Sequence, residues 1–415
     1  MSAPYPESAK SRVWSLSPAN MDLLLLGIGQ IISWGTTFYT FTLTGPKIVA
    51  ELNLPVELIY GGYSLMLVTG GLAAQPIGRW LDHYGARPVM TLGSLLAALG
   101  LALMAGVSGV WSYLLVSAFA GLSMAMVLYD AAFTAIVQIH PGSARRSISI
   151  LTLYGGFAST IFWPLAGFIQ GVSNWRTVYV VFALLNLFVC VPLHWYGLRK
   201  RAPASDASPQ NPPTEALAKG RMHGEARRWA MILFAGVLTA SNFIAGGVST
   251  LAIPALESLG MSAQLSVFVG MMFGPAQVIG RICEMQFQEA FSPILVGRIS
   301  ALLMPVGVAA LVFGGGAIVP ALIFAVLYGF ANGLMTIAKG SVALDLFGSS
   351  GYGAILGRLS VATLVARAGA PALFAWIMHA SGTPAMLWTA FGAGLIGLAL
   401  MEVLARLSAR QNQPG

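Results

Sequence analysis

The stretch GRWLDHYGARP, residues 78–88, is a short polar connection between two long apolar runs, near 58–80 and 88–107. Each run is long enough to cross the roughly 30 Å hydrocarbon core of a bilayer as a helix. The whole chain has this character, because 57% of its 415 residues are hydrophobic and only 9% are charged. So few polar side chains could not cover a water-soluble globule. We therefore expect an all-α membrane protein with the lipid bilayer as its main solvent.

The connection itself has a clear physical logic. Gly78 and Gly85 permit close packing and a tight turn, because glycine has no side chain to exclude a neighbour. Asp82 can accept hydrogen bonds from Arg79 or Arg87, and also from the N-terminus of a helix opposite. The pattern predicts a structured contact at the membrane surface rather than a loose loop.

Apolar runs of spanning length recur along the chain, in two groups of six separated by one long polar stretch. They lie near 21–46, 58–80, 88–107, 111–138, 148–171, 176–198, 229–256, 264–284, 293–313, 317–341, 353–379 and 384–407. The polar stretch is rich in Pro, Ala, Ser and charge and cannot bury a core. The predicted division is a tail over 1–20, a six-helix bundle over 21–198, a linker over 199–228, a second bundle over 229–407 and a tail over 408–415.

The arginines and lysines predict the orientation. The net charge is +8, and the basic residues gather at span ends that belong to one side, together with the linker. The other side has little beyond Lys47 and Arg176. The positive-inside rule then places both termini and the linker in the cytoplasm of a multi-pass plasma membrane protein, the inner membrane in a bacterium. Basic residues between apolar spans indicate topology, and we expect no nucleic-acid partner.

The two groups of spans are related by an internal repeat. AAQPIGR ends at Arg79 and PAQVIGR ends at Arg281, 202 residues later. Pro46 and Pro254 are 208 residues apart. With an even number of spans in each half, the repeats run parallel, and a site between them near the midplane is expected.

The stretch 78–88 closely resembles the signature of the major facilitator superfamily between its second and third helices. Gly78, Asp82, Gly85 and Arg87 stand at matching positions, with Tyr84 as the aromatic residue. The resemblance implies twelve transmembrane helices in two parallel six-helix repeats, a monomer, and secondary active transport of a small molecule by alternating access. It also implies that Asp82 and its arginines latch the cytoplasmic ends of the two halves.

Two further stretches extend the resemblance. The copy of the signature in the second half keeps Gly280 and Arg281 but has Glu284 in place of the aspartate and no clear glycine turn, so we expect that latch to be degenerate. ARRSISILTLYGG, residues 144–156, is loosely similar to the monocarboxylate and organic-anion branch of the superfamily.

Three ionisable residues stand out inside the predicted spans, where a charge costs about 2.5–3.5 kcal/mol by insertion scales. Asp130 and Lys339 occupy nearly equivalent places in the two halves and could face one another as a gate or coupling pair. Arg367 lies near the middle of its span and can hardly reach water. It is either a docking point for a carboxylate or oxyanion, or a structural partner of Asp130 or another acceptor. Asp130 is the candidate for proton coupling if it is not paired.

Polar and aromatic residues at helical spacing predict the walls of the site. The first span is dense in hydroxyl and aromatic groups, and its stripe is matched by polar positions on the fourth, seventh and tenth spans. The candidates are Gln30, Trp34, Thr37, Phe41, Tyr129, Asn242, Asn332 and Thr336. Contacts between helices through small and polar residues are the alternative explanation of these stripes.

The sequence lacks a P-loop, a catalytic triad pattern and a metal-ligand cluster, so we expect neither an enzyme nor a cofactor. The leading hypothesis is a transporter of a small organic anion coupled to protons or another ion. Efflux of toxic, drug-like or metalloid compounds is a second transport hypothesis. A non-transporting membrane receptor of the same fold is the alternative from another class.

Overall fold

The computed structural model describes residues 18–198 and 220–411, and within these ranges the chain is helical without strands. The predicted tail over 1–20 and the linker over 199–228 fall largely outside the described residues. Before the gap, the elements are α1 (Pro18–Ser33), η1 (Trp34–Tyr39), α2 (Thr40–Leu52), α3 (Val56–Tyr84), α4 (Ala86–Ala105), α5 (Val110–Val127), α6 (Tyr129–Ile139), η2 (Pro141–Ser143), α7 (Ala144–Gly156), α8 (Ala158–Val172), α9 (Trp175–Leu185), η3 (Asn186–Cys190) and α10 (Val191–Gly197).

After the gap, six helices follow. They are α12 (Gly224–Ser258), α13 (Ala263–Met271), α14 (Phe273–Phe287), α15 (Pro293–Gly314), α16 (Ile318–Phe347) and α17 (Tyr352–Gln411). α17 is interrupted at Gly382, whose φ of 82° and ψ of 167° are not helical. It therefore consists of two helices joined at a sharp bend.

Ten helical segments among the described residues are long and apolar enough to cross a membrane. This finding establishes the all-helical, multi-pass character of the protein. α3 is not among the ten, and α17 is counted once although Gly382 divides it. The number twelve stays a prediction, with α3 and the second part of α17 as the remaining candidates.

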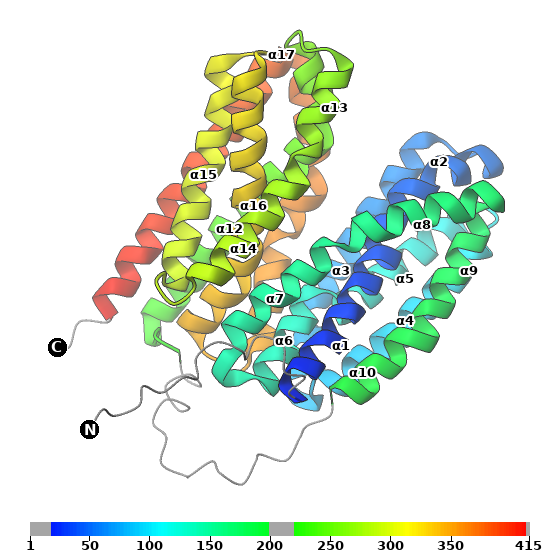
Figure 1. Cartoon of the computed structure of the whole chain (residues 1–415), viewed down its shortest axis with the longest axis horizontal. Coiled ribbons are helices and arrows are strands. Elements are labelled where there is room, and N and C mark those ends of the chain that lie inside the picture. The colour runs from blue at the N-terminus through cyan, green and yellow to red at the C-terminus, as the bar shows by residue number, and fades with distance from the viewer. Residues whose placement is uncertain (1–17, 199–219, 412–415) are drawn as a thin grey trace, which may run out of the picture.

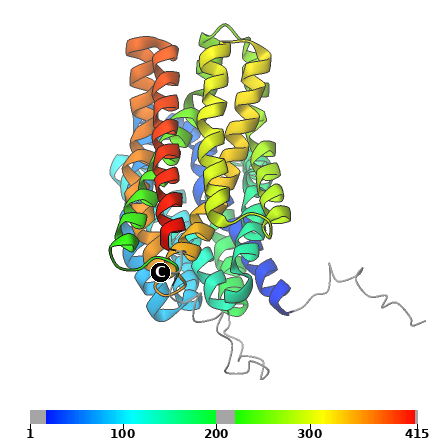
Figure 2. The same ribbon diagram turned by 90° about the vertical axis from the view of Figure 1, so that its left-hand side faces the viewer.

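The helices form two bundles, one built from α1 to α10 and the other from α12 to α17 (Figure 1). The start of α1 and the end of α17 lie at the same end of the molecule, where the bundles meet (Figure 1). Figure 2 shows the second bundle from its outer side, with the C-terminus at this end. We call this end the closed end. Toward the other end the two bundles diverge (Figure 1).

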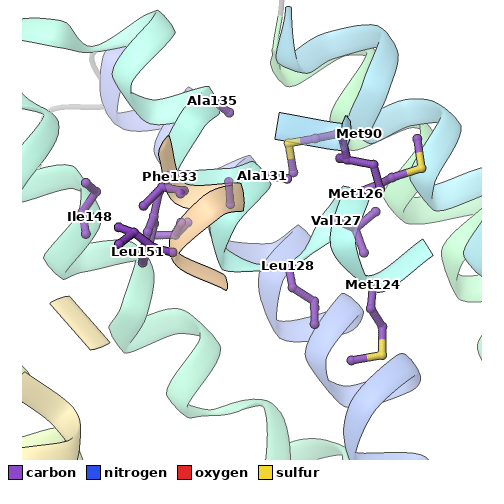
Figure 3. Packing of buried hydrophobic residues seen from close by; sticks show 14 of the residues in the cluster. Met90, Met124, Met126, Val127, Leu128, Ala131, Phe133, Ala135, Ile148 and Leu151 are labelled. Carbon is purple, nitrogen blue, oxygen red and sulfur yellow. The ribbon is translucent and has the colours of Figure 1, made fainter. Parts of the chain in front are cut away.

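The apolar core follows the same division. One cluster of buried side chains runs from the first bundle into the closed-end part of the second, and joins Phe133 and Ile148 to Ile337 and Tyr352. Phe133, Ile148 and Leu151 lie together in the close view of this cluster (Figure 3). A separate cluster, which includes Val248 and Phe374, belongs to the second bundle alone. The bundles therefore share a core only at the closed end.

Several predicted spans are broken helices. The predicted span 111–138 divides at Leu128, whose ψ of −167° is extended and separates α5 from α6. The side-chain amide of Gln30 donates to the carbonyl oxygen of Val127 at 2.6 Å, which satisfies a backbone group at the break. The first span contains the π-helix η1, where the helical repeat is wider than 3.6 residues. These irregularities place the ends of half-helices inside the membrane region.

Candidate functional site

An ion pair joins the two bundles within the membrane region. Lys339 on α16 donates from Nζ to Asp130 Oδ1 of α6 at 2.5 Å and to Ser360 Oγ of α17 at 2.8 Å. The Ser360 hydroxyl in turn donates to the other oxygen of Asp130. Both charged side chains are about three-quarters buried, with exposed fractions of 23% and 25%. We refer to Asp130, Lys339 and Ser360 as the triad.

The break in the fourth predicted span positions the acid of the triad. Because α6 begins at Tyr129, Asp130 lies in the first turn of a new helix. A carboxylate is stabilised there by the positive end of the helix dipole. The prediction that Asp130 faces Lys339 is therefore confirmed, and the alternative pairing with Arg367 does not occur.

Arg367 faces the first bundle from the middle of the first part of α17. Its guanidinium carbon lies 5.4 Å from the centre of the Phe38 ring of η1, a cation–π contact. The side chain is partly exposed, and no carboxylate among the described residues pairs with it. Ser360 precedes Arg367 by seven residues, or two helical turns, so both lie on one face of α17 about 10 Å apart. Arg367 is therefore a cation beside the triad without an anionic partner.

Aromatic rings connect Arg367 to the triad. The ring of Phe38 is 5.1 Å from that of Trp34, and Trp34 is 4.9 Å from Tyr129, the residue before Asp130. All three side chains are partly buried. Trp34 and Tyr129 thus lie between Arg367 and the triad, and their contact with a substrate stays a prediction.

The rest of the predicted stripe on the first span lies elsewhere. Gln30, Thr37 and Phe41 are at most 3% exposed and lie inside the first bundle, where the Phe41 ring packs against Tyr179 and Thr37 lines the same small cavity. The expectation that they line a wall between the bundles is wrong in this conformation. The stripe assumed a repeat of 3.6 residues, but η1 is a π-helix, so the side chains after Trp34 point in other directions.

Three of the predicted polar site residues belong to the second bundle. Asn242, Asn332 and Thr336 are all partly exposed. The Asn242 amide and the Thr336 hydroxyl bond to carbonyl oxygens of their own helices. Their contact with a ligand stays a prediction.

A first latch closes the end of the molecule where the termini lie. Asp82 at the end of α3 accepts hydrogen bonds from the backbone N–H groups of Gly353 and Ala354, each at 2.8 Å. These N–H groups belong to the first turn of α17, where a helix has donors to spare and a positive dipole. The predicted contact with a helix N-terminus is confirmed.

The arginines of this segment do not bind Asp82, and that part of the prediction is wrong. Arg79 is exposed and has no bonded partner among the described residues. Arg87 stacks on the ring of Trp195 at 3.9 Å. Both oxygens of Asp82 already accept backbone donors, so the arginines serve elsewhere.

The glycines of the signature are explained by geometry. A Cβ atom on Gly78 would lie 2.1 Å from the carbonyl oxygen of Gly353, so only glycine allows α3 and α17 to approach so closely. Gly85 has a φ of 84°, which favours glycine, and ends α3. The side chain of Gln138 then bonds to Leu81 and Ala86 on either side of this turn.

A second latch joins α14 to α7, and the expectation that it is degenerate is wrong. Glu284 is 3% exposed and accepts hydrogen bonds from Arg145 Nε at 3.0 Å and from the hydroxyl of Ser149. Arg145 also donates to the carbonyl oxygens of Gln288 and Phe291 after α14, at 2.8 and 2.7 Å. Glu284 lies 202 residues after Asp82, so the two acids are repeat-related and both reach the start of a helix in the opposite bundle.

Arg281, one turn before Glu284, is buried at the same place. It is 6% exposed and donates to the carbonyl oxygen of Thr152 on α7 at 2.8 Å, while its Nε has no partner among the described residues. Gly156 leaves room for this guanidinium, since a Cβ atom there would lie 2.7 Å from it. Arg281 therefore packs against α7, next to Thr152 and Gly156, in this conformation.

We expect Arg145→Ala to weaken the closed end, because the substitution leaves the carboxylate of Glu284 buried without its cation. Removing one partner of a buried pair costs about 3 kcal/mol, which corresponds to a population shift of more than a hundredfold if only the closed conformation makes the contact. Spin labels at the exposed positions 146 and 289, in a background without cysteine, would report longer distances.

The matched control for this variant is Arg298→Ala. It breaks the ion pair between Arg298 and Glu402, which lies wholly within the second bundle. This control should leave the distance between the labels unchanged. An unchanged distance in Arg145→Ala as well would show that the second latch does not hold the bundles together.

Comparison with known proteins identifies the family. A sequence model of the Major Facilitator Superfamily matches residues 26–338, which is most of the chain. The chain belongs to the major facilitator superfamily. No curated protein matches the sequence significantly. Both latches therefore lie in a facilitator fold, and their acids occupy repeat-related positions.

Solved structures agree with this facilitator fold. The human organic anion transporter MFSD10 (TETRAN) superposes with a TM-score of 0.69 at 17% identity, covering 93% of this chain and 100% of that one. The proton:xylose symporter XylE, bound to 6-bromo-6-deoxy-D-glucose, gives 0.72 at 13% identity, with 94% and 96% covered. The transporter FucP in its outward conformation gives 0.67 at 14% identity, with 96% and 100% covered. At these identities the likeness shows the fold of this facilitator and not its substrate.

Sequence reasoning missed several residues of the site in this facilitator. Ser360 and Ser149 are ordinary small polar residues in spanning helices, and nothing in their sequence context distinguishes them. Arg145 belongs to the stretch 144–156 that resembles the monocarboxylate branch and is also one of the basic residues at span ends, but neither observation predicts its bond to Glu284. Phe38 lies in the predicted aromatic segment, one position away from the expected stripe, where the π-helix brings it under Arg367.

Proposed function

We propose that this protein is a secondary active transporter of a small organic anion, with Arg367 as the contact for the anionic group. The observation that carries the proposal is the guanidinium of Arg367, which lies over Phe38 without a carboxylate partner among the described residues. An arginine keeps its charge in any protein environment and binds carboxylates through two parallel hydrogen bonds. Membership of the superfamily supports transport, and one structural neighbour is described as an organic anion transporter.

The charge balance inside the bundles supports an anion over a neutral solute. The triad is internally neutral, because Asp130 and Lys339 compensate each other. Arg367 adds a positive charge that no described acid offsets, and an unpaired charge in a membrane helix is costly. A bound anion would offset this charge, whereas a sugar would leave it.

The triad and the latches supply the conformational part of the mechanism. All of these contacts join the two bundles, and they lie at or toward the closed end. We propose that this conformation alternates with one in which these contacts separate and the opposite ends approach. We assign this conformation to the outward-facing state, because the basic residues predict that both termini lie in the cytoplasm.

We also propose that the triad couples transport to protons. When the bundles separate at the closed end, Asp130 on α6 loses Lys339 on α16. A proton can then take the place of Lys339 as the group that neutralises this carboxylate in the membrane region. Binding and release of a proton by Asp130 would then follow the conformational cycle.

A binding experiment tests the role of Arg367. Purified protein in detergent should be stabilised by carboxylates such as acetate, succinate or benzoate and not by glucose. At a hundred times the dissociation constant, the gain is about 2.7 kcal/mol, which a thermal unfolding curve resolves. Arg367→Gln should remove this gain, and Arg367→Lys should keep part of it because the charge remains. Equal stabilisation of Arg367→Gln by the same anion would rule out the proposed contact.

A further inference from the structure

We propose that the anion carries a flat, apolar body, with an aromatic carboxylate as the best fit, and that Phe38 selects it. This inference rests on the proposed function and deepens it. It names the chemistry of the part of the substrate that Arg367 does not bind.

The first argument is the composition of the wall that faces Arg367. The Phe38 ring lies within 5.1–5.8 Å of the rings of Trp34, Tyr39 and Tyr63, each in an edge or T-shaped arrangement. Trp34 and Phe38 come from η1, and Tyr63 comes from α3. An aromatic group set among such rings gains offset or edge contacts that an acyclic aliphatic group cannot make.

The second argument is burial. Trp34, Phe38 and Tyr63 pack against the shared core but are themselves only partly buried. We expect an aromatic ring with a purely structural role in the core to be fully buried. Phe133 and Tyr179, which are 0% exposed, are examples. The partly exposed Phe38 ring meets the guanidinium of Arg367, which reaches across from the second bundle. One ligand can therefore contact both the apolar surface of these rings and the guanidinium of Arg367.

The third argument is an unused donor. The indole N–H of Trp34 is buried and has no hydrogen-bond partner among the described residues. A buried donor without an acceptor is rare in proteins and costs free energy. An oxygen of a ligand held between Trp34 and Arg367 would satisfy it. A carboxylate attached directly to a ring would present oxygen and apolar surface at the required sides.

We assign the other face of the ligand to the polar residues that the sequence predicts for the second bundle. Asn242, Asn332 and Thr336 provide amide and hydroxyl groups there. A planar ligand would meet rings on the side of the first bundle and polar groups on the other. Substituents that hydrogen-bond, such as a ring hydroxyl, are compatible with this arrangement.

The test compares benzoate, acetate and benzyl alcohol as probes of the full-length protein, with thermal stabilisation as the readout. Benzoate should bind more tightly than acetate, and benzyl alcohol, which has the ring without the charge, should not bind. Phe38→Ala should weaken benzoate about tenfold, the loss expected for an aromatic pair and its buried area, and leave acetate unchanged. Phe38→Tyr should retain the preference for benzoate. Phe38→Leu should lose the preference for benzoate over acetate. Leucine is an apolar residue of similar bulk, so this variant should still fold.

The control variant is Phe168→Ala, a ring that is 67% exposed on α8. It should leave the binding of both acids unchanged. Equal affinity of the wild type for benzoate and acetate, or an equal loss of both in Phe38→Leu, would overturn the inference while Arg367 remained the anion contact. If Arg367→Gln still bound both acids as the wild type does, the proposed function itself would fail.

Discussion

Replacing Lys339 with methionine should reduce transport at least about tenfold, and replacing Asp130 with asparagine in the same chain should restore part of it. The single variant leaves the Asp130 carboxylate largely buried, with the hydroxyl of Ser360 as its remaining partner in the triad. Interacting residues of this kind show coupling energies of about 0.5–3 kcal/mol, enough for the tenfold effect. In the double variant the triad carries no charge at all.

Two transport assays separate gating from coupling in this double variant. Exchange of labelled for unlabelled substrate across proteoliposomes requires binding and reorientation, but no ion gradient. Accumulation driven by a proton gradient requires the coupling group as well. We expect Asp130→Asn with Lys339→Met to recover exchange and to remain unable to accumulate substrate. Recovery of both activities would show that the triad is a gate and that the proton is carried elsewhere.

Replacing Gly78 with leucine should open the closed end. Even a Cβ atom at this position would lie 2.1 Å from the carbonyl oxygen of Gly353, a backbone atom that cannot rotate away. Overpacking of this kind costs about 1–3 kcal/mol or more, and only in the conformation that brings α3 against α17. The separation would also break the bonds of Asp82 to the first turn of α17. Spin labels at His83 and Ser350, both exposed, should report a longer distance in the variant.

The matched control is Gly167→Leu on α8. No atom lies within 4 Å of a Cβ atom built at Gly167, so a leucine there meets open space. The control should leave the distance between the labels as in the wild type. A closed end that persisted in Gly78→Leu would mean that the glycine contact is not what brings the two helices together.

The sequence was sufficient for features that depend on local chemistry and on composition. Long apolar runs predict membrane helices because lipid cannot satisfy polar side chains, and the all-helical multi-pass fold follows. The role of Asp82 toward a helix N-terminus follows from the preference of carboxylates for that end of a helix. The near-equivalence of Asp130 and Lys339 in the repeat predicted their pairing, because parallel repeats bring corresponding positions to the same depth.

The failures arise where the helix departs from its regular repeat or where contact is made across the bundles. The stripe assumed a regular α-helix, and η1 changes the direction of the side chains of Thr37 and Phe41. Gln30 precedes η1 and instead turns inward to the carbonyl oxygen of Val127 at the break between α5 and α6. The role of Glu284 was missed because its donors, Arg145 and Ser149, lie more than 130 residues away in the chain. The absence of a glycine turn suggested that the second latch had decayed. In the structure, Glu284 accepts from the side chains of Arg145 and Ser149, whereas Asp82 in the first latch accepts from backbone N–H groups.

Exchange of radiolabelled benzoate in proteoliposomes, compared between the wild type and Arg367→Gln, tests the central claim most directly. The assay requires the substrate to bind between the bundles and to be presented on both sides, and it requires no coupling ion. The account predicts saturable exchange by the wild type, competition by other carboxylates, and exchange near the level of empty liposomes in Arg367→Gln. Wild-type rates of exchange in Arg367→Gln would contradict it.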